Sequence, residues 1–388
     1  MRRLFGRRLW IGTSSALLAS VLSGAASAIL GLCGPFTDVS DASFCPFVLE
    51  ILTLGITTGT TATTYDPTSS VTRLQMAAFL SRTVDGALLR GGRRAAMNRF
   101  WTPKSIVLGL TTVGASPNNV RSDGSDLWVA SRSGTVSRVH ASDGRLLDTW
   151  TGAGAANDAV LALGQVFVNS YSTPGNLYSI DPTQPAGVVT TLATNLGGSS
   201  DGITFDGTRI WTANQASSVS IVTNTGVPPW TVTTVTAGFQ VPTGILTDGS
   251  NIWVTDYGAG TLLKLASSAA ILSTVTLGGG PAFPAYDGAN IWVPRNGAVS
   301  VAVVRASSGA VLATLTGNGL SLPNSAAFDG ERILVTNYTG NHVSLWKAAD
   351  LTPLGSIATG AGTYPVGACS DGVSFWVTFL GSSQLARF

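Results

Sequence analysis

Residues 328–346 read FDGERILVTNYTGNHVSLW, and the order of residue types in this stretch indicates β-strands. A polar Asp-Gly pair is followed by an apolar run, then a short polar loop, and then a second apolar run. Short apolar runs rich in Val, Ile and Trp and separated by turn residues are typical of β-strands joined in hairpins. The same order of features returns along the chain at Asp123, Asp206, Asp248, Asp287 and Asp371.

The repeat has a nearly constant length. Successive turn glycines are 40, 43, 42, 39, 42 and 42 residues apart, and they are Gly124, Gly164, Gly207, Gly249, Gly288, Gly330 and Gly372. A period of about 40 to 45 residues with four short strands in each unit is the signature of β-propeller blades. The sequence therefore predicts an all-β fold with seven blades over residues 105–388.

The ring is expected to close through the two ends of this region. The last unit stops at Phe388, one strand short of a full blade, and residues 105–114 resemble the missing strand. An N-terminal strand that completes the C-terminal blade would leave few sheet edges unpaired. We therefore predict that this strand completes the last blade and closes the ring.

Two repeated features of each unit could be structural or functional. The Asp-Gly pairs could bind calcium, but a two-residue turn with both residues at positive φ explains them without a metal. One position of the second strand carries a large apolar residue in every unit, namely Trp128, Phe167, Trp211, Trp253, Trp292, Leu334 and Trp376. Such a position could form a ring of ligand-stacking aromatics, but packing between blades is the stronger interpretation. Cys369, on a predicted inner strand, is interpreted as a small buried apolar residue.

These strands resemble the YVTN-type propeller repeat, as in RILVTNYTGNHVSLW and NIWVTDYGAGTLLKL, which is related to lyase-like and surface-layer propellers. The resemblance covers residues 105–388 and implies the fold. It does not imply an activity, because this family includes binding proteins and enzymes.

Residues 1–28 are predicted to be an export signal. Four arginines precede a short apolar segment, and small residues end at Ala28. Arg7 to Ile11 also resembles a twin-arginine signal, so the export route stays open. The whole chain has 22 Lys and Arg against 20 Asp and Glu. Removal of the signal leaves 18 against 20, which gives no support for nucleic-acid binding. We expect an exported protein at the cell surface, in the periplasm or outside the cell, without a membrane span after cleavage.

Residues 29–86 are predicted to form a small helical module. They resemble an S-layer homology motif at Phe36, Asp38, Gly59, Tyr65, and Val71 to Arg73. The resemblance implies non-covalent attachment to cell-wall or envelope glycopolymer, with Thr72 and Arg73 holding the anionic polymer. Gln75 stands where the family has an acid, and one copy is present where the family's binding unit is usually built from three. Self-association, or a purely structural role, is therefore the alternative.

Cys33 and Cys45 are close together in a predicted exported protein, so a disulfide is expected. Residues 87–104 are predicted to be a basic linker. Residues 82–104 hold six basic side chains against one acid, Asp85. Contact with anionic glycopolymer or lipid headgroups is one interpretation, and a solvated linker is the other.

The sequence has few residues suited to catalysis. It contains two histidines, His140 and His342, and the propeller region has a single glutamate, Glu331. The streptogramin lyases share a related fold and use His and Glu, but their motif has no match here. We predict no catalytic residue, cofactor or metal site. The primary hypothesis is an exported envelope protein with a non-catalytic binding or scaffold propeller, and the alternative is an exported lyase-like or hydrolase-type enzyme.

Any ligand is expected on the propeller face formed by the loops that follow the second strands. The polar and aromatic residues of these loops suit a saccharide or peptide, although ordinary hydrated loops have the same composition. The predicted residues are Arg132, Asn169, Tyr171, Asn214, Gln215, Asp256, Tyr257, Arg295, Asn296, Asn337 and Tyr338.

Overall fold

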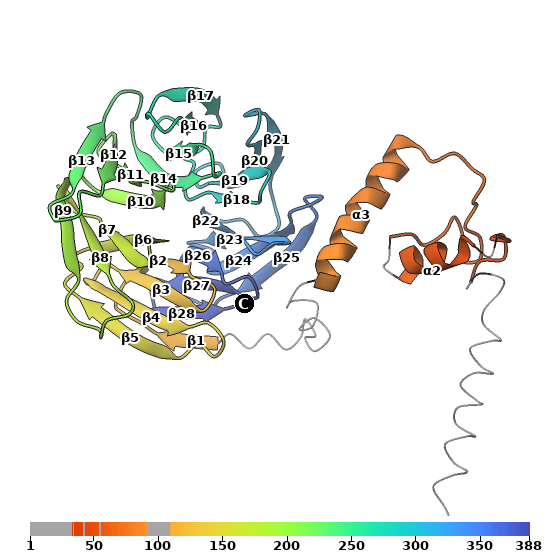
Figure 1. Ribbon diagram of the computed structural model, residues 1–388, viewed down its shortest axis with the longest axis horizontal. Coiled ribbons are helices and arrows are strands. Elements are labelled where there is room, and N and C mark those ends of the chain that lie inside the picture. Colours follow the sequence, from red (N-terminus) through yellow and green to blue (C-terminus); the bar gives the residue numbers. More distant parts are fainter. Residues whose placement is uncertain (1–32, 34, 42, 54–55, 92–108) are drawn as a thin grey trace, which may run out of the picture. The chain divides into compact units, whose positions relative to one another are not determined.

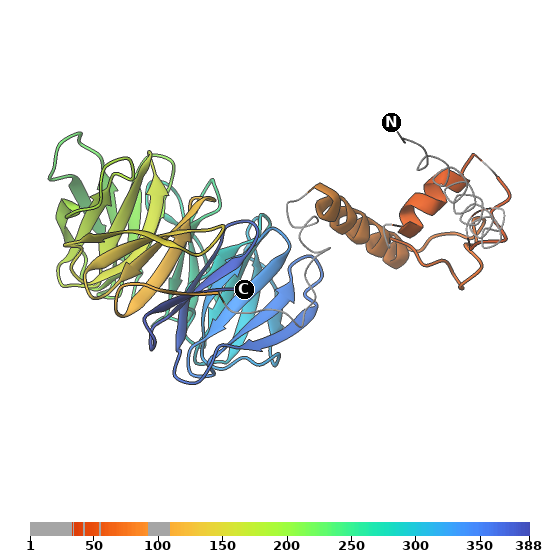
Figure 2. The same ribbon diagram turned by 90° about the horizontal axis from the view of Figure 1, so that it is seen from below.

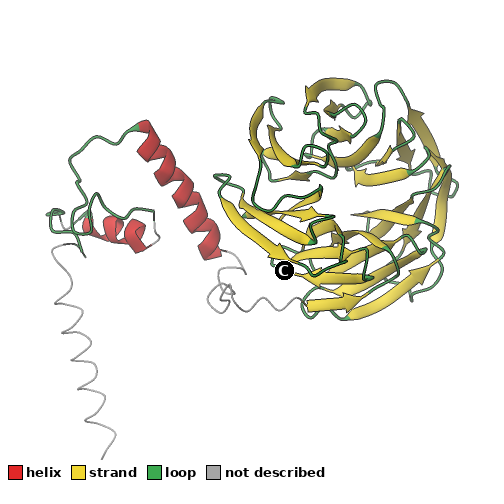
Figure 3. Cartoon of the chain, turned by 180° about the vertical axis from the view of Figure 1, so that it is seen from behind, coloured by secondary structure: helices red, strands yellow, loops and turns green. Residues whose placement is uncertain are grey.

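The computed structural model describes residues 33, 35–41, 43–53, 56–91 and 109–388. The chain divides into two compact units, Met1–Phe100 and Trp101–Phe388, which are described separately (Figures 1 and 3). The predicted signal segment 1–28 lies outside the described residues, as does most of the predicted linker 87–104.

The second unit is a seven-bladed β-propeller. Seven antiparallel sheets of four strands surround a central axis (Figure 1), and Figure 2 shows the ring from the side. The described part of this unit contains strands and turns but no helix, as the sequence predicts. Blades are numbered here in chain order, and their strands run from the axis outward.

The strand bounds are as follows. Blade 1 holds β2 (Pro117–Ser122), β3 (Asp126–Ser131), β4 (Thr135–His140) and β5 (Leu146–Thr151). Blade 2 holds β6 (Ala156–Ala162), β7 (Gln165–Ser170), β8 (Gly175–Ile180) and β9 (Thr190–Leu196). Blade 3 holds β10 (Ser200–Phe205), β11 (Ile210–Asn214), β12 (Ser218–Thr223) and β13 (Thr231–Val235). Blade 4 holds β14 (Pro242–Thr247), β15 (Ile252–Asp256), β16 (Thr261–Leu265) and β17 (Ile271–Thr276).

The remaining blades follow the same plan. Blade 5 holds β18 (Ala285–Tyr286), β19 (Asn290–Arg295), β20 (Ser300–Arg305) and β21 (Val311–Leu315). Blade 6 holds β22 (Pro323–Phe328), β23 (Arg332–Asn337), β24 (His342–Lys347) and β25 (Pro353–Ala358). Blade 7 holds β26 (Pro365–Ser370), β27 (Phe375–Phe379), β28 (Gln384–Arg387) and β1 (Gly109–Thr112).

The ring closes through β1, as the sequence predicts. β1 pairs antiparallel with β28, with Gly109 opposite Arg387 and Thr112 opposite Gln384. The backbone N–H of Val113 extends this pairing by donating to the carbonyl of Ser383 at 3.1 Å. β1 is the outer strand of a blade whose other three strands are the last in the chain. Residues 105–108 of the predicted strand lie outside the described residues.

The large apolar position of each second strand packs between blades, which confirms the structural interpretation. All seven residues are at most 1% exposed. Trp128 of blade 1 packs with Ala156 and Val166 of blade 2. Each following residue packs on the next blade in the same way, and Trp376 of blade 7 packs on Val120 and Val129 of blade 1. Because this contact repeats around the whole ring, the core is continuous from blade to blade. Cys369 belongs to the same cluster between blades 7 and 1, and it is also buried.

The Asp-Gly turns differ from the expectation. Only the glycine has positive φ, for example +90° at Gly124, and the preceding aspartate is not in this region. The aspartate instead acts as a cap, and Oδ1 of Asp248 accepts the N–H groups of Ser250 and Asn251 at 2.9 and 2.7 Å. Oδ2 of the same residue accepts Nε1–H of Trp253 at 2.8 Å. Both turn residues have positive φ only in blade 2, where Leu163 replaces the aspartate.

The first unit contains α2 (Cys45–Thr53) and α3 (Arg73–Gly91). The predicted disulfide joins Cys33 to Cys45, whose Cα atoms are 5.4 Å apart. Phe36 is fully buried in a small core that includes Val39 and Val48. Across the described residues, no helix is both long and apolar enough to span a membrane.

Candidate ligand-binding site at the mouth of the propeller

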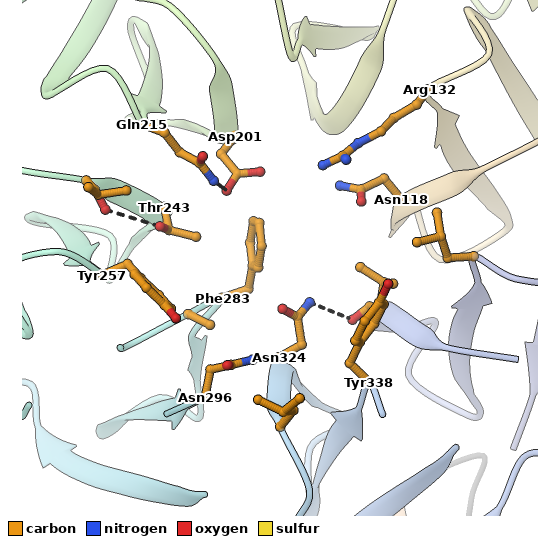
Figure 4. A pocket seen from close by; sticks show the side chains of 15 residues that line it. Asn118, Arg132, Asp201, Gln215, Thr243, Tyr257, Phe283, Asn296, Asn324 and Tyr338 are labelled. Atoms are coloured by element: carbon orange, nitrogen blue, oxygen red, sulfur yellow. Dashed lines mark hydrogen bonds between the residues drawn. The ribbon is translucent and has the colours of Figure 1, made fainter. Parts of the chain in front are cut away.

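A cavity of about 550 Å³ opens at the centre of the propeller (Figure 4). This volume lies within the range of about 300–1,000 Å³ that is usual for small-ligand pockets. Two equivalent positions of each blade supply most of its lining. One is near the start of the innermost strand, and the other follows the end of the second strand.

The inner position lies at or just before the beginning of the innermost strand. Six of its seven residues line the cavity: Asn118, Asp201, Thr243, Ala282, Asn324 and Val366. Phe283, the residue after Ala282, lines the cavity as well. The seventh, Asn157 of blade 2, is fully buried and binds its neighbours on both sides. This position was not among the residues predicted from the sequence. A signal for it was present, because the preceding residue is Pro, Ala or Ser in every blade.

The outer position lies four residues after the large apolar residue of the second strand. Six of its seven residues line the cavity: Arg132, Gln215, Tyr257, Asn296, Tyr338 and Leu380. The structure therefore brings five of the predicted residues together at the mouth. Tyr171, the blade 2 residue at this position, lies behind them. Its hydroxyl donates to Oε1 of Gln215 at 2.7 Å. The guanidinium carbon of Arg132 lies over the Tyr171 ring, 4.5 Å from the ring centroid.

The other predicted residues do not line the cavity, because they lie two or three positions after the same apolar residue. Asn169, Asn214, Asp256 and Asn337 are fully buried. Their side chains bind neighbouring backbone or hydroxyl groups. The carboxylate of Asp256, for example, accepts the N–H groups of Gln240 and Val241 at 2.6 and 2.9 Å. Arg295 is partly buried and donates from its guanidinium to the carbonyl of Leu277 at 2.5 Å.

A hydrogen-bond network from blades 1 to 3 forms one wall of the cavity. Nδ2 of Asn118 and Nε of Arg132 donate to Oδ1 of Asn157 at 3.0 and 3.1 Å. Nδ2 of Asn157 donates onward to Oδ1 of Asp201 at 2.8 Å. Nε2 of Gln215 donates to Oδ2 of Asp201, also at 2.8 Å. Because each of these side chains holds the next, the wall is organised before any ligand arrives.

Among the described residues that line this cavity, Asp201 is the one acid. Burial raises its pKa to about 6, although hydrogen bonds from Gln215 and Asn157 and the charge of Arg132 favour ionisation. Asp158, the residue after Asn157, is fully buried and forms an ion pair with Arg121 at 2.6 Å. Burial also raises the pKa of Asp158, and the charge of Arg121 opposes this.

The opposite wall comes from blades 4 to 6 and is more apolar. Figure 4 shows Tyr257, Asn296, Asn324 and Tyr338 across the cavity from Asp201 and Arg132. Phe283 is 8% exposed, and Tyr257 at the rim is 44% exposed. The cavity is therefore amphipathic, with a charged network on one side and aromatic rings on the other.

Neither histidine lines this cavity. His140, in β4, has its Nδ1 3.1 Å from Oδ1 of Asp143 and 3.0 Å from Oγ of Ser142. His342, in β24, has its Nδ1 2.8 Å from the carbonyl of Gly340. Within the described ranges, no three His, Cys, Asp or Glu side chains are grouped closely enough to bind a metal ion.

In the first unit, Thr72 and Arg73 mark the beginning of α3. Oγ1 of Thr72 accepts the N–H of Gln75 at 3.2 Å, and Oε1 of Gln75 accepts the N–H of Thr72 at 2.9 Å. These reciprocal bonds are a capping box, so the Thr72 hydroxyl has a structural role. Arg73, one residue further on, is exposed.

Comparisons with known proteins agree with both units. Residues 35–77 match the S-layer homology domain, a module of cell-surface proteins that typically binds cell-wall polymers. The chain thus joins an S-layer homology domain to a seven-bladed propeller. No curated protein matches the sequence.

By structure, the chain is similar to a catalytically inactive virginiamycin B lyase from Staphylococcus aureus crystallised with quinupristin. The TM-score is 0.61 at 14% identity, over 72% of this chain and 99% of that one. A streptogramin B lyase structure gives the same TM-score and identity, over 72% and 96% of the two chains. The WD40 β-propeller domain of Doa1 gives 0.58 at 15% identity, with the same coverage. At these identities the likeness shows the fold alone.

Proposed function

We propose that this protein is an exported, surface-attached binding protein without catalytic activity. The S-layer homology domain attaches it to envelope glycopolymer, and the mouth of the propeller binds a ligand. The observation that carries the binding role is the cavity, because twelve of its lining residues come from two equivalent positions repeated around the ring. A rigid scaffold that presents different side chains at equivalent positions suits recognition.

The attachment role rests on the match of residues 35–77 and on exposed residues of α3. Arg73 is exposed at the beginning of this helix, where the positive end of the helix dipole adds to its charge. Both favour an anionic polymer. Since one copy of the domain is present, several chains associated through this unit would present several copies to the polymer.

The lyase alternative receives no comparable support. The described cavity residues include one carboxylic acid and no histidine, and the two histidines belong to strands in blades 1 and 6. Likeness to lyases at 14% identity concerns the fold. We therefore do not propose a lyase activity.

Co-sedimentation with purified envelope glycopolymer tests the attachment role. The full chain should sediment with the polymer, and Arg73→Glu should weaken this several-fold because a positive contact becomes repulsive. Arg145→Glu, on an exposed propeller side chain, is the matched charge control and should sediment like wild type. Equal sedimentation of all three chains, together with unchanged envelope retention after deletion of residues 29–104, would contradict attachment through this domain.

A further inference from the structure

We propose that the mouth cavity binds a neutral, hydroxyl-rich ligand, and specifically a hexopyranose unit of an oligosaccharide. This inference rests on the proposed binding function and names the chemical class of the ligand. The juxtaposition of the Asn118–Arg132–Asp201–Gln215 wall with the aromatic wall of Tyr257, Phe283 and Tyr338 carries it.

The polar wall offers donors and acceptors side by side. Arg132 lines the cavity and uses Nε toward Asn157, and its two terminal NH₂ groups are further donors. Each carboxylate oxygen of Asp201 accepts one protein hydrogen bond and can accept another. Oδ1 of Asn118 adds a neutral acceptor. A sugar hydroxyl both donates and accepts, so it can bridge such neighbouring groups, whereas a ligand with only acceptors leaves half of them unused.

The charges of this wall disfavour ionic ligands. Arg132 and Asp201 lie close enough for the arginine charge to favour ionisation of the aspartate. An anionic ligand drawn to Arg132 meets the carboxylate of Asp201, and a cationic ligand drawn to Asp201 meets Arg132. Because the two charges compensate within one network, the wall selects a neutral ligand that forms hydrogen bonds.

The opposite wall offers apolar surface for contact with the sugar ring. A pyranose ring has a face of C–H groups as well as its rim of hydroxyls. Tyr257 and Tyr338 are amphipathic rings at the rim, and Phe283 is nearly buried below them. Tyr338 also packs against Tyr364, with ring centroids 5.3 Å apart, which orients it. The C–H face can lie on these rings while the hydroxyls reach the polar wall.

The test is a binding measurement on the full chain with defined probes. An array presents neutral oligosaccharides of glucose, galactose, mannose and N-acetylglucosamine, with oligogalacturonate and short peptides as comparators. Titration calorimetry then measures the best neutral probe against wild type, Arg132→Gln and Gln215→Leu. Arg305→Gln, an exposed arginine outside this cavity, is the matched control. Thermal unfolding of each variant verifies that it is folded.

We expect a neutral oligosaccharide to bind, with about a tenfold or greater loss of affinity in both cavity variants and none in the control. Binding of only oligogalacturonate or peptide, with the same sensitivity to Arg132→Gln, would overturn the saccharide inference and leave the binding function standing. Neutral binding that both variants retain, or no binding by any neutral probe, would also overturn it. The attachment experiment is independent of each of these outcomes.

Discussion

At the scale of single residues, Asp201 is a buried acid whose environment opposes its charge. Burial raises its pKa to about 6, above the value of 3.8 usual for the unfolded chain. A folded pKa above the unfolded one means that the folded state holds the proton more tightly. The contribution of Asp201 to the free energy of unfolding therefore falls as pH rises from about 4 to about 6, and it stays lower above that.

We predict that Asp201→Asn removes this pH-dependent loss. Relative to wild type, the variant should gain up to about 3 kcal/mol in free energy of unfolding between pH 4 and pH 7, the energy equivalent of a pKa difference of this size. Urea unfolding of both chains at a series of pH values measures the difference.

Asp181→Asn provides a control of opposite sign. Hydrogen bonds from the Thr183 hydroxyl and N–H lower the pKa of Asp181 in the folded state. Its ionised carboxylate therefore stabilises the fold above the pKa of the unfolded state, and this stabilisation is lost as pH falls through the pKa of the folded state. The stability of this variant relative to wild type should therefore decline as pH rises. If the free energies of unfolding of Asp201→Asn and wild type change in parallel from pH 4 to pH 7, the pKa of Asp201 is not raised.

Single-residue roles were predictable where they repeat. Trp128, Trp253 and Trp376 occupy the same position in three different blades, and inter-blade packing followed directly from that regularity. The role of the turn aspartate was only half predictable. Its place at the turn could be read from the sequence, but its bond to the indole of the same hairpin depends on a side-chain direction that spacing alone does not give.

At the scale of an element, the end of each second strand separates structural from exposed side chains. Residues two and three positions after the large apolar residue do not line the cavity. In blades 4, 6 and 7 the residue two positions later is a threonine whose hydroxyl bonds to the next blade, as Thr336 does to the carbonyl of Val366 at 2.7 Å. The residue four positions later lines the cavity in every blade except blade 2.

We predict that the adjacent residues Asp256 and Tyr257 respond very differently to replacement by alanine. Asp256→Ala should lower the free energy of unfolding by about 3 kcal/mol or more, because three backbone N–H groups lose a buried, charged acceptor. Tyr257→Ala should cost less than about 1 kcal/mol, because its side chain is 44% exposed. Urea unfolding at pH 7 measures both, and equal losses would contradict this division.

This division explains which part of the site the sequence could predict. The loops after the second strands were identified as a group, and five of the predicted residues line the cavity. Asn337 and Tyr338 are equally plausible ligand contacts in the sequence, since both are polar and adjacent. They differ in the structure because β23 includes Asn337 and ends there. The side-chain amide of Asn337 donates to the hydroxyl of Ser344 at 2.9 Å, whereas Tyr338 follows the strand and lines the cavity.

At the scale of the whole molecule, the number of repeats predicted the number of blades, and the incomplete last unit predicted the closing strand. Asn157 shows why the inner lining could not be predicted in the same way. It occupies the same position as Asn118 and Asp201, yet it lies beneath both and connects them. Such a network depends on three blades meeting at the axis, which no single repeat contains.

Closure itself gives the last prediction. β1 is the only strand of blade 7 that comes from the beginning of the propeller, and its pairing with β28 joins chain segments more than 270 residues apart. Replacing both Leu110 and Thr111 by proline removes a ladder N–H whichever of the two positions donates it, so the free energy of unfolding should fall by about 3 kcal/mol or more. Replacing both by alanine keeps the N–H groups and should cost about 1 kcal/mol. β28 would become an unpaired edge in the proline variant, so this variant should also self-associate in sedimentation velocity runs. A monomeric proline variant as stable as the alanine variant would show that β1 does not hold the ring closed.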